Sequence, residues 1–229
     1  MEASSNKEAF FEKLDEMREK DPLIGAKMGA EDIYARLLAA IKEPEGRVNC
    51  SNLMFNAASL AGYGCQAAVW QKYVIDAKMP VKSVFVVITT EDDESYYLGD
   101  AINAYMIEGK FSIWEIVSGM YKHLYPNEEL PDVKDYVTKV ESALGDKNAK
   151  VFGVNTPIEP FNSIWDTLKP VICRYCKTPD EWVVLFGVLL QKVLLSCKGV
   201  VPPKESMDMI MESALYMSKR DISSKMTAE

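Results

Sequence analysis

The chain has 229 residues, of which 48% are hydrophobic and 26% charged, so it can bury a large core and cannot be disordered throughout. Its net charge of −8, from 34 acidic against 26 basic residues, argues against nucleic acid or an anionic membrane as the main partner, since either requires clustered positive charge. The N-terminal segment lacks the pattern of a secretory signal, and the longest apolar run, 182–190, is too short to span a bilayer. Five cysteines, an odd number, indicate a reducing cytoplasm rather than a disulfide framework.

The dominant hydrophobic period along the chain is helical. Apolar residues recur on one face in about eight segments, several of which begin at a capping residue or end at glycine or proline. The expected helices cover approximately residues 10–17, 30–42, 49–74, 113–124, 133–144, 164–175, 179–198 and 207–217. The helix over 179–198 is apolar nearly all round, which predicts a central position in the fold.

One segment departs from the helical period. Residues 83–90 are apolar and β-branched, 91–95 are polar and turn-like, and 96–100 resume with β-forming residues, which predicts a β-hairpin over 83–100. Because two strands alone are marginally stable in water, we expect a third short strand at 150–154.

These elements predict a mostly α (α+β) protein with a small β-hairpin or three-stranded element. We expect a single compact domain over residues 1–229, with frayed tails at 1–5 and 223–229. A division into two domains near residue 128 is the weaker alternative.

The stretch LAGYGCQAAVW places Cys65 directly after Gly62 and Gly64. If the two glycines form a turn, Cys65 begins a new helix, and the N–H groups of the helix N-terminus would lower the pKa of its thiol. The small residues of CQAA and the β segment that follows resemble, over about residues 60–100, the papain and transglutaminase-like arrangement, in which a cysteine heads a helix and the strands behind it carry a histidine and then an acid or amide.

The resemblance implies a Cys-dependent hydrolase or transferase, with Cys65 as nucleophile and Asp100 as the orienting acid. The hairpin contains no histidine, so the general base would have to be His123, the single histidine of the chain.

The alternative is a continuous helix. Ala57, Ala61, Cys65 and Ala68 then fall on one face, and such a stripe of small side chains lets a neighbouring helix approach closely. We favour this packing interpretation and expect the helix to run through Gly64.

The chain also contains a CxxC motif, Cys173 and Cys176, at the C-terminal end of an expected helix. The helix dipole raises a thiol pKa there, and no second cysteine or histidine pair lies at zinc-site spacing. We therefore interpret the motif as incidental and expect neither a metal nor a cofactor.

No phosphate loop, dinucleotide fingerprint, nucleophile elbow or HExxH motif is present, whereas apolar helical faces are abundant and the last helix is rich in methionine. We therefore expect a non-catalytic cytoplasmic protein that acts through protein contacts, including homodimerisation, or through a small apolar ligand held between the helices 49–74 and 179–198. The Cys-dependent enzyme with Cys65, His123 and Asp100 is the alternative.

Overall fold

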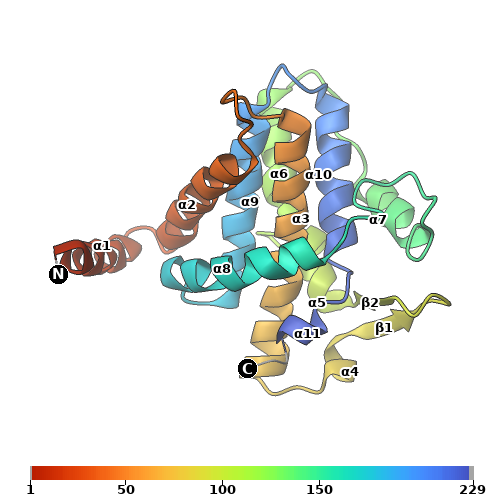
Figure 1. Ribbon diagram of the computed structural model, residues 1–229, viewed down its shortest axis with the longest axis horizontal. Coiled ribbons are helices and arrows are strands. Elements are labelled where there is room, and N and C mark those ends of the chain that lie inside the picture. Colours follow the sequence, from red (N-terminus) through yellow and green to blue (C-terminus); the bar gives the residue numbers. More distant parts are fainter. Residues whose placement is uncertain (1, 227–229) are drawn as a thin grey trace.

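The computed structural model describes residues 2–226, with side chains from Ala9 onward, and is mostly helical with one small antiparallel sheet, as the sequence predicts (Figure 1). Its α-helices are α1 (Glu2–Arg18), α2 (Ile24–Ile41), α3 (Cys50–Val69), α4 (Val81–Val84), α5 (Asp100–Asn103), α6 (Ile113–Leu124), α7 (Val133–Ser142), α8 (Glu159–Tyr175), α9 (Pro179–Ser196), α10 (Pro203–Met217) and α11 (Ser223–Met226). Two π-helical segments, η1 (Trp70–Asp76) and η2 (Ala104–Glu108), continue α3 and α5, and the strands are β1 (Val86–Thr89) and β2 (Ser95–Leu98).

Helix α3 lies at the centre of the molecule. It packs against α9 and α10, and α9 packs in turn against α2 and α6, so that α3, α6, α9 and α10 run side by side (Figure 1). Every residue of α3 from Ala57 to Val69 is buried. Helix α9 is buried over most of its length, which confirms the central position that its apolar sequence predicts.

The helix runs through Gly62 and Gly64 without a break, as expected. A Cβ atom on Gly62 would overlap the carbonyl oxygen of Ala214 in α10, and one on Gly64 would overlap the ring of Phe186 in α9. Both glycines therefore serve close helix packing rather than a turn. Glycine is required here for its lack of a side chain and not for its backbone freedom.

The expected third strand at 150–154 is wrong, because this segment forms turns. Gly153 has φ +99° and Asn155 has φ +66°, values outside the strand region. Instead, the chain that leaves α10 borders β2: the Tyr97 N–H donates to the Lys219 carbonyl at 2.7 Å, and Tyr96 forms an isolated bridge with Arg220.

The frayed tails expected at residues 1–5 and 223–229 fall only partly within the described residues. Residue 1 and residues 227–229 lie outside the described residues, whereas 2–5 belong to α1 and 223–226 form α11, which buries Met226. Across residues 2–226, no helix combines the length and apolar character that crossing a bilayer requires.

The glycine contacts predict opposite effects of the same substitution at two helical sites. Gly62→Ala should lower the free energy of unfolding by about 2 kcal/mol, because overpacking outweighs the gain of about 1 kcal/mol in helix propensity. A Cβ atom on Gly119 in α6 would meet no heavy atom within 4 Å, so Gly119→Ala, the matched control, should raise stability by about 0.5–1 kcal/mol. Urea denaturation measures both, and a neutral Gly62→Ala would contradict close contact between α3 and α10.

Candidate functional site

The structure places Cys65 deep in the core. Its side chain is 0% exposed in the middle of α3, and burial raises the pKa of its thiol far above the ordinary range. The free N–H groups of α3 lie four turns earlier, where the Asn49 side chain accepts from Asn52 N, so they do not act on Cys65. The thiol therefore remains protonated at neutral pH.

The other two members of the predicted catalytic set lie at the surface. His123 is exposed in the last turn of α6, and Asp100 is exposed at the first residue of α5. Within the described part of the chain, no hydrogen bond or ion pair joins any two of Cys65, His123 and Asp100. The structure thus does not bring nucleophile, base and acid together.

The CxxC cysteines differ in environment. Cys173 is exposed, whereas Cys176 is buried, and burial together with the nearby carboxylate of Glu181 raises the pKa of the Cys176 thiol. Among residues 2–226, no group of three or more His, Cys, Asp or Glu side chains is placed to hold a metal ion.

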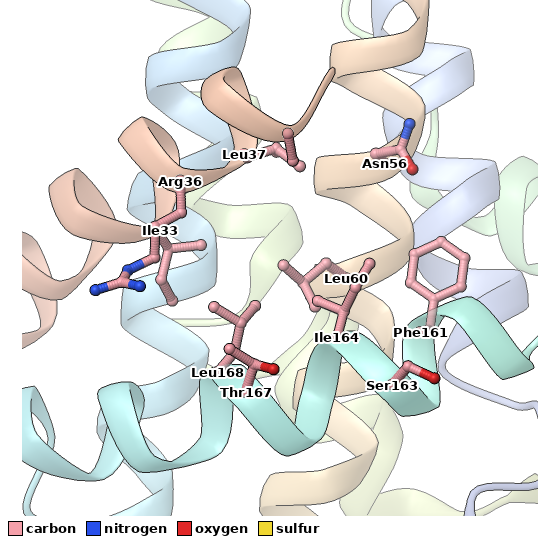
Figure 2. A pocket seen from close by; sticks show the side chains of 11 residues that line it. Ile33, Arg36, Leu37, Asn56, Leu60, Phe161, Ser163, Ile164, Thr167 and Leu168 are labelled. Atoms are coloured by element: carbon pink, nitrogen blue, oxygen red, sulfur yellow. The ribbon is translucent and has the colours of Figure 1, made fainter. Parts of the chain in front are cut away.

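A hollow of about 320 Å³ opens between α2, α3 and α8 (Figure 2). Most of its lining is apolar and comes from all three helices. The large apolar side chains that line it are Ile33, Leu37, Leu60, Phe161, Ile164 and Leu168. We call this hollow the apolar groove.

The apolar groove exists because α8 crosses α3 instead of running along it (Figure 1). Trp165 anchors the crossing: its ring lies 5.2 Å from that of Tyr63 in α3 and 5.8 Å from that of Trp182 in α9. Ile164, the residue before Trp165, lines the groove with 41% of its surface exposed. The floor, in contrast, is made of buried side chains such as Ile33 and Leu60.

Four polar side chains stand at the edge of the apolar groove: Arg36, Asn56, Ser163 and Thr167 (Figure 2). Arg36 is the one charged side chain among the described lining residues, and Asp32 holds it through Nε at 2.8 Å and Nη2 at 3.4 Å. Asn56 and Ser163 each donate to a carbonyl of their own helix. Among the described residues that line the groove there is no carboxylate, histidine or cysteine, so its chemistry is that of binding.

The sequence predicts a ligand between the helices 49–74 and 179–198. In the middle of this interface Gly64 brings α3 into direct contact with Phe186 of α9, whereas at its end Tyr73 and Val184 line a separate hollow. The signal for the apolar groove lies in α8: Phe161, Trp165, Leu168 and Ile172 are its buried face, while Ile164 extends the apolar stripe beyond that face. A stripe wider than one packing face indicates a second apolar surface.

A second hollow, of about 560 Å³, lies between η1, η2 and the start of α9 and contains a charged cluster. Lys72 Nζ lies 2.8 and 2.9 Å from the two carboxylate oxygens of Asp180, and the Tyr105 hydroxyl donates to the same carboxylate at 2.6 Å. Burial acts to raise the pKa of Asp180, but these hydrogen bonds outweigh it and hold the pKa below its usual value. Asp180 is therefore ionised, and Lys72 balances its negative charge. The cluster connects both π-helical segments to α9.

Compared with protein-family models, curated proteins and solved structures, the chain shows no match. Its function is therefore inferred from its own geometry. The apolar groove has the lining of a ligand site, whereas in the hollow beside η1 and η2 the side chains of Lys72, Tyr105 and Asp180 are engaged with one another.

The burial of Cys65 predicts an unreactive thiol. In the native protein at pH 8, a thiol reagent should modify the exposed Cys173 first and leave Cys65 unmodified until the protein is unfolded in guanidinium. Peptide mass spectrometry after timed labelling identifies each site, and the unfolded chain, labelled at all five cysteines, is the control. Modification of Cys65 as fast as that of Cys173 would instead support a catalytic thiol.

Proposed function

We propose that this protein is a non-catalytic binding protein that holds a small apolar ligand in the apolar groove. The observation that carries the proposal is the hollow of about 320 Å³ itself, with its apolar floor and few polar groups at the edge. Ligand sites in proteins are typically hollows of about 300–1,000 Å³ with this composition.

The walls of the groove set the size of the occupant. Its lining comes from about two turns of α2, one turn of α3 and two turns of α8, so the groove is about 11 Å long. That length accommodates the apolar body of a small molecule.

The polar edge suggests the chemistry of one end of the ligand. Asp32 engages one N–H each of Nε and Nη2 of Arg36, which leaves the remaining N–H groups of the guanidinium as donors. An acidic group on an apolar body would place its charge there, while its apolar part covers Ile164 and the floor. Because Asp32 already offsets part of the positive charge, we expect Arg36 to add modest affinity and the apolar contact to supply most of it.

Substitution at the groove edge tests the site. Titration with decanoate, followed by native mass spectrometry and calorimetry, should show one bound molecule per chain, and Ile164→Asp should weaken binding at least tenfold because it places a charge in the apolar contact. Leu195→Glu is the matched control: Leu195 is 54% exposed on α9, lies outside the groove, and its replacement should leave affinity unchanged. No binding by the wild-type protein, or equal loss in both variants, would overturn the proposal.

The role of Arg36 has its own test. Arg36→Gln should weaken binding of decanoate about three- to tenfold and leave binding of decanol nearly unchanged, since only the acid interacts with the guanidinium. The lost ion pair with Asp32 spans i and i+4 on a helix surface, so folding stability should fall by only about 0.3–0.5 kcal/mol. An equal loss of affinity for the acid and the alcohol would show that Arg36 shapes the groove without interacting with the carboxylate of the ligand.

A further inference from the structure

The outer edge of the hairpin is apolar and unpaired. Val86, Val87 and Ile88 of β1 are 62%, 41% and 45% exposed, and β1 pairs with β2 alone among the described residues. The hairpin extends away from the helices, with β1 on the side away from α10 (Figure 1). An exposed apolar edge strand is a template for pairing with another strand.

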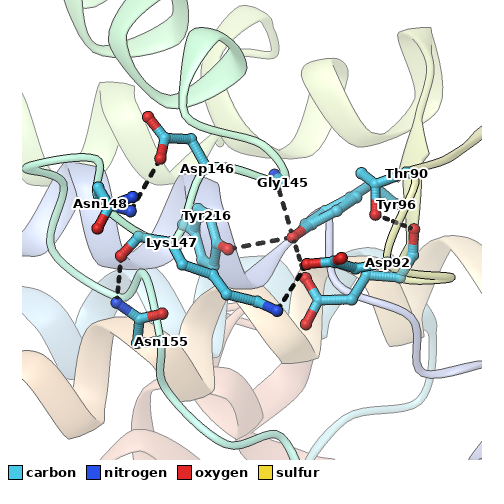
Figure 3. A network of polar contacts seen from close by, with 10 residues as sticks. Thr90, Asp92, Tyr96, Gly145, Asp146, Lys147, Asn148, Asn155 and Tyr216 are labelled. Atoms are coloured by element: carbon cyan, nitrogen blue, oxygen red, sulfur yellow. Dashed lines mark hydrogen bonds and ion pairs between the residues drawn. The ribbon is translucent and has the colours of Figure 1, made fainter.

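The hairpin is firmly held, so this edge is presented in a fixed position. Figure 3 shows the contacts at its tip: the buried Tyr96 hydroxyl donates to Glu94 at 2.8 Å, accepts from Gly145 N at 3.3 Å, and lies 3.3 Å from the Tyr216 hydroxyl. Lys147 Nζ lies 2.7 Å from a carboxylate oxygen of Asp92. These contacts fix the turn to α10 and to the loop that follows α7.

The pairing register shows which backbone groups of β1 face outward. Val87 lies opposite Tyr97, whose N–H points away from β1 to the Lys219 carbonyl. In an antiparallel ladder, two residues that lie opposite each other either both point their N–H and C=O groups towards the partner strand or both point them away from it. The N–H and C=O of Val87 therefore also point away from β2. Thr89, two residues further, does the same, in agreement with the inward bond from Thr90 N to the Glu94 carbonyl.

We propose that β1 pairs antiparallel with β1 of a second copy of this chain, across a two-fold axis at Ile88. In this register Val87 of each copy faces Thr89 of the other, and the outward N–H and C=O groups of both residues form hydrogen bonds. Ile88 faces Ile88 of the second copy in a non-hydrogen-bonded pair, where side chains lie closest. The two hairpins together form a four-stranded sheet, which overcomes the marginal stability of two strands.

The charges that flank β1 favour a second copy as the occupant. Lys82 is exposed in α4, the helical turn that precedes β1, and Glu91 and Asp93 are exposed in the turn after it. None of these three side chains forms an ion pair within the described chain. Antiparallel self-pairing brings the basic end of one β1 beside the acidic end of the other, whereas parallel pairing would bring like charges together.

A strand of four residues forms a small interface, so the expected dimer is weak. Interfaces at the low end of the size range are transient, and we expect a dissociation constant of about 10–100 µM that rises with salt concentration. The dimer does not depend on the apolar groove, because no residue of β1 lines it.

Disulfide cross-linking tests the register. In a Cys173→Ser background, Ile88→Cys should give a covalent dimer under mild oxidation, because the two substituted positions would lie about 4.5 Å apart at Cα, within disulfide range. Val86→Cys is the matched control: Val86 is more exposed and on the same face, but its two copies would lie about 13 Å apart along the sheet. Equal cross-linking at both positions would indicate random collision and overturn the proposal.

Sedimentation velocity tests the dimer without cysteines. The wild-type protein should shift from monomer to dimer between about 5 µM and 1 mM. Ile88→Glu should raise the dissociation constant at least tenfold, because it opposes two like charges across the axis, whereas Val200→Glu, an exposed site after α9, should not change it. A wild-type chain that stays monomeric over the whole range would overturn the proposal. That outcome would also be expected if β1 pairs only with a strand of another protein.

Discussion

The close approach of α3 to α9 and α10 is the constraint on which the rest of the structure depends. Gly62 allows the backbone of α10 to contact α3, and Gly64 admits the ring of Phe186 between α3 and α9. Burial of a long apolar helix on both sides offsets the low helix propensity of two glycines, about 1 kcal/mol each. Every other element is placed relative to this central packing.

That constraint also decides the chemistry of the centre. Cys65 lies on the same small-residue face, so the packing that needs a small side chain there also removes its thiol from water. Surfaces for function are left to the elements that diverge from the centre. Helix α8 crosses α3 and leaves the apolar groove beside it, and the hairpin extends beyond α10 and leaves the β1 edge (Figure 1).

Much of the fold could be predicted from the sequence because local patterns determine it. A helical period of apolar residues marks each long helix, and the run of β-branched residues before a polar turn marks the hairpin. The expected strand at 150–154 does not form, because Gly153 within it and Asn155 just after it adopt positive φ. The sequence shows only that glycine permits a positive φ, not that Gly153 adopts one. Lys219 and Arg220 lie beside β2, and this contact joins segments more than 120 residues apart in the sequence. No local sequence pattern reveals such a contact.

The apolar groove was harder to predict for a different reason. The small-residue stripe of α3 indicates close packing with α9 around Gly64, which argues against a catalytic Cys65 and against a cavity at that point of the interface. The apolar groove instead depends on the angle at which α8 crosses α3. Trp165 sets that crossing through Tyr63 and Trp182, contacts that exist only in the folded chain.

The apolar groove and the β1 edge are linked through one segment, the loop between α7 and α8. Its first part holds the hairpin through Gly145 and Lys147, and its end leads into the groove-lining turns of α8. Asn155 bonds back to the Lys147 carbonyl at 2.7 Å, and Arg220 donates to the Thr156 carbonyl, so the loop is tied along its length. Coupling between two sites requires an element with two arrangements of similar free energy. A loop with its own internal bonds favours one arrangement, and for that reason we expect ligand binding and strand pairing to be energetically independent.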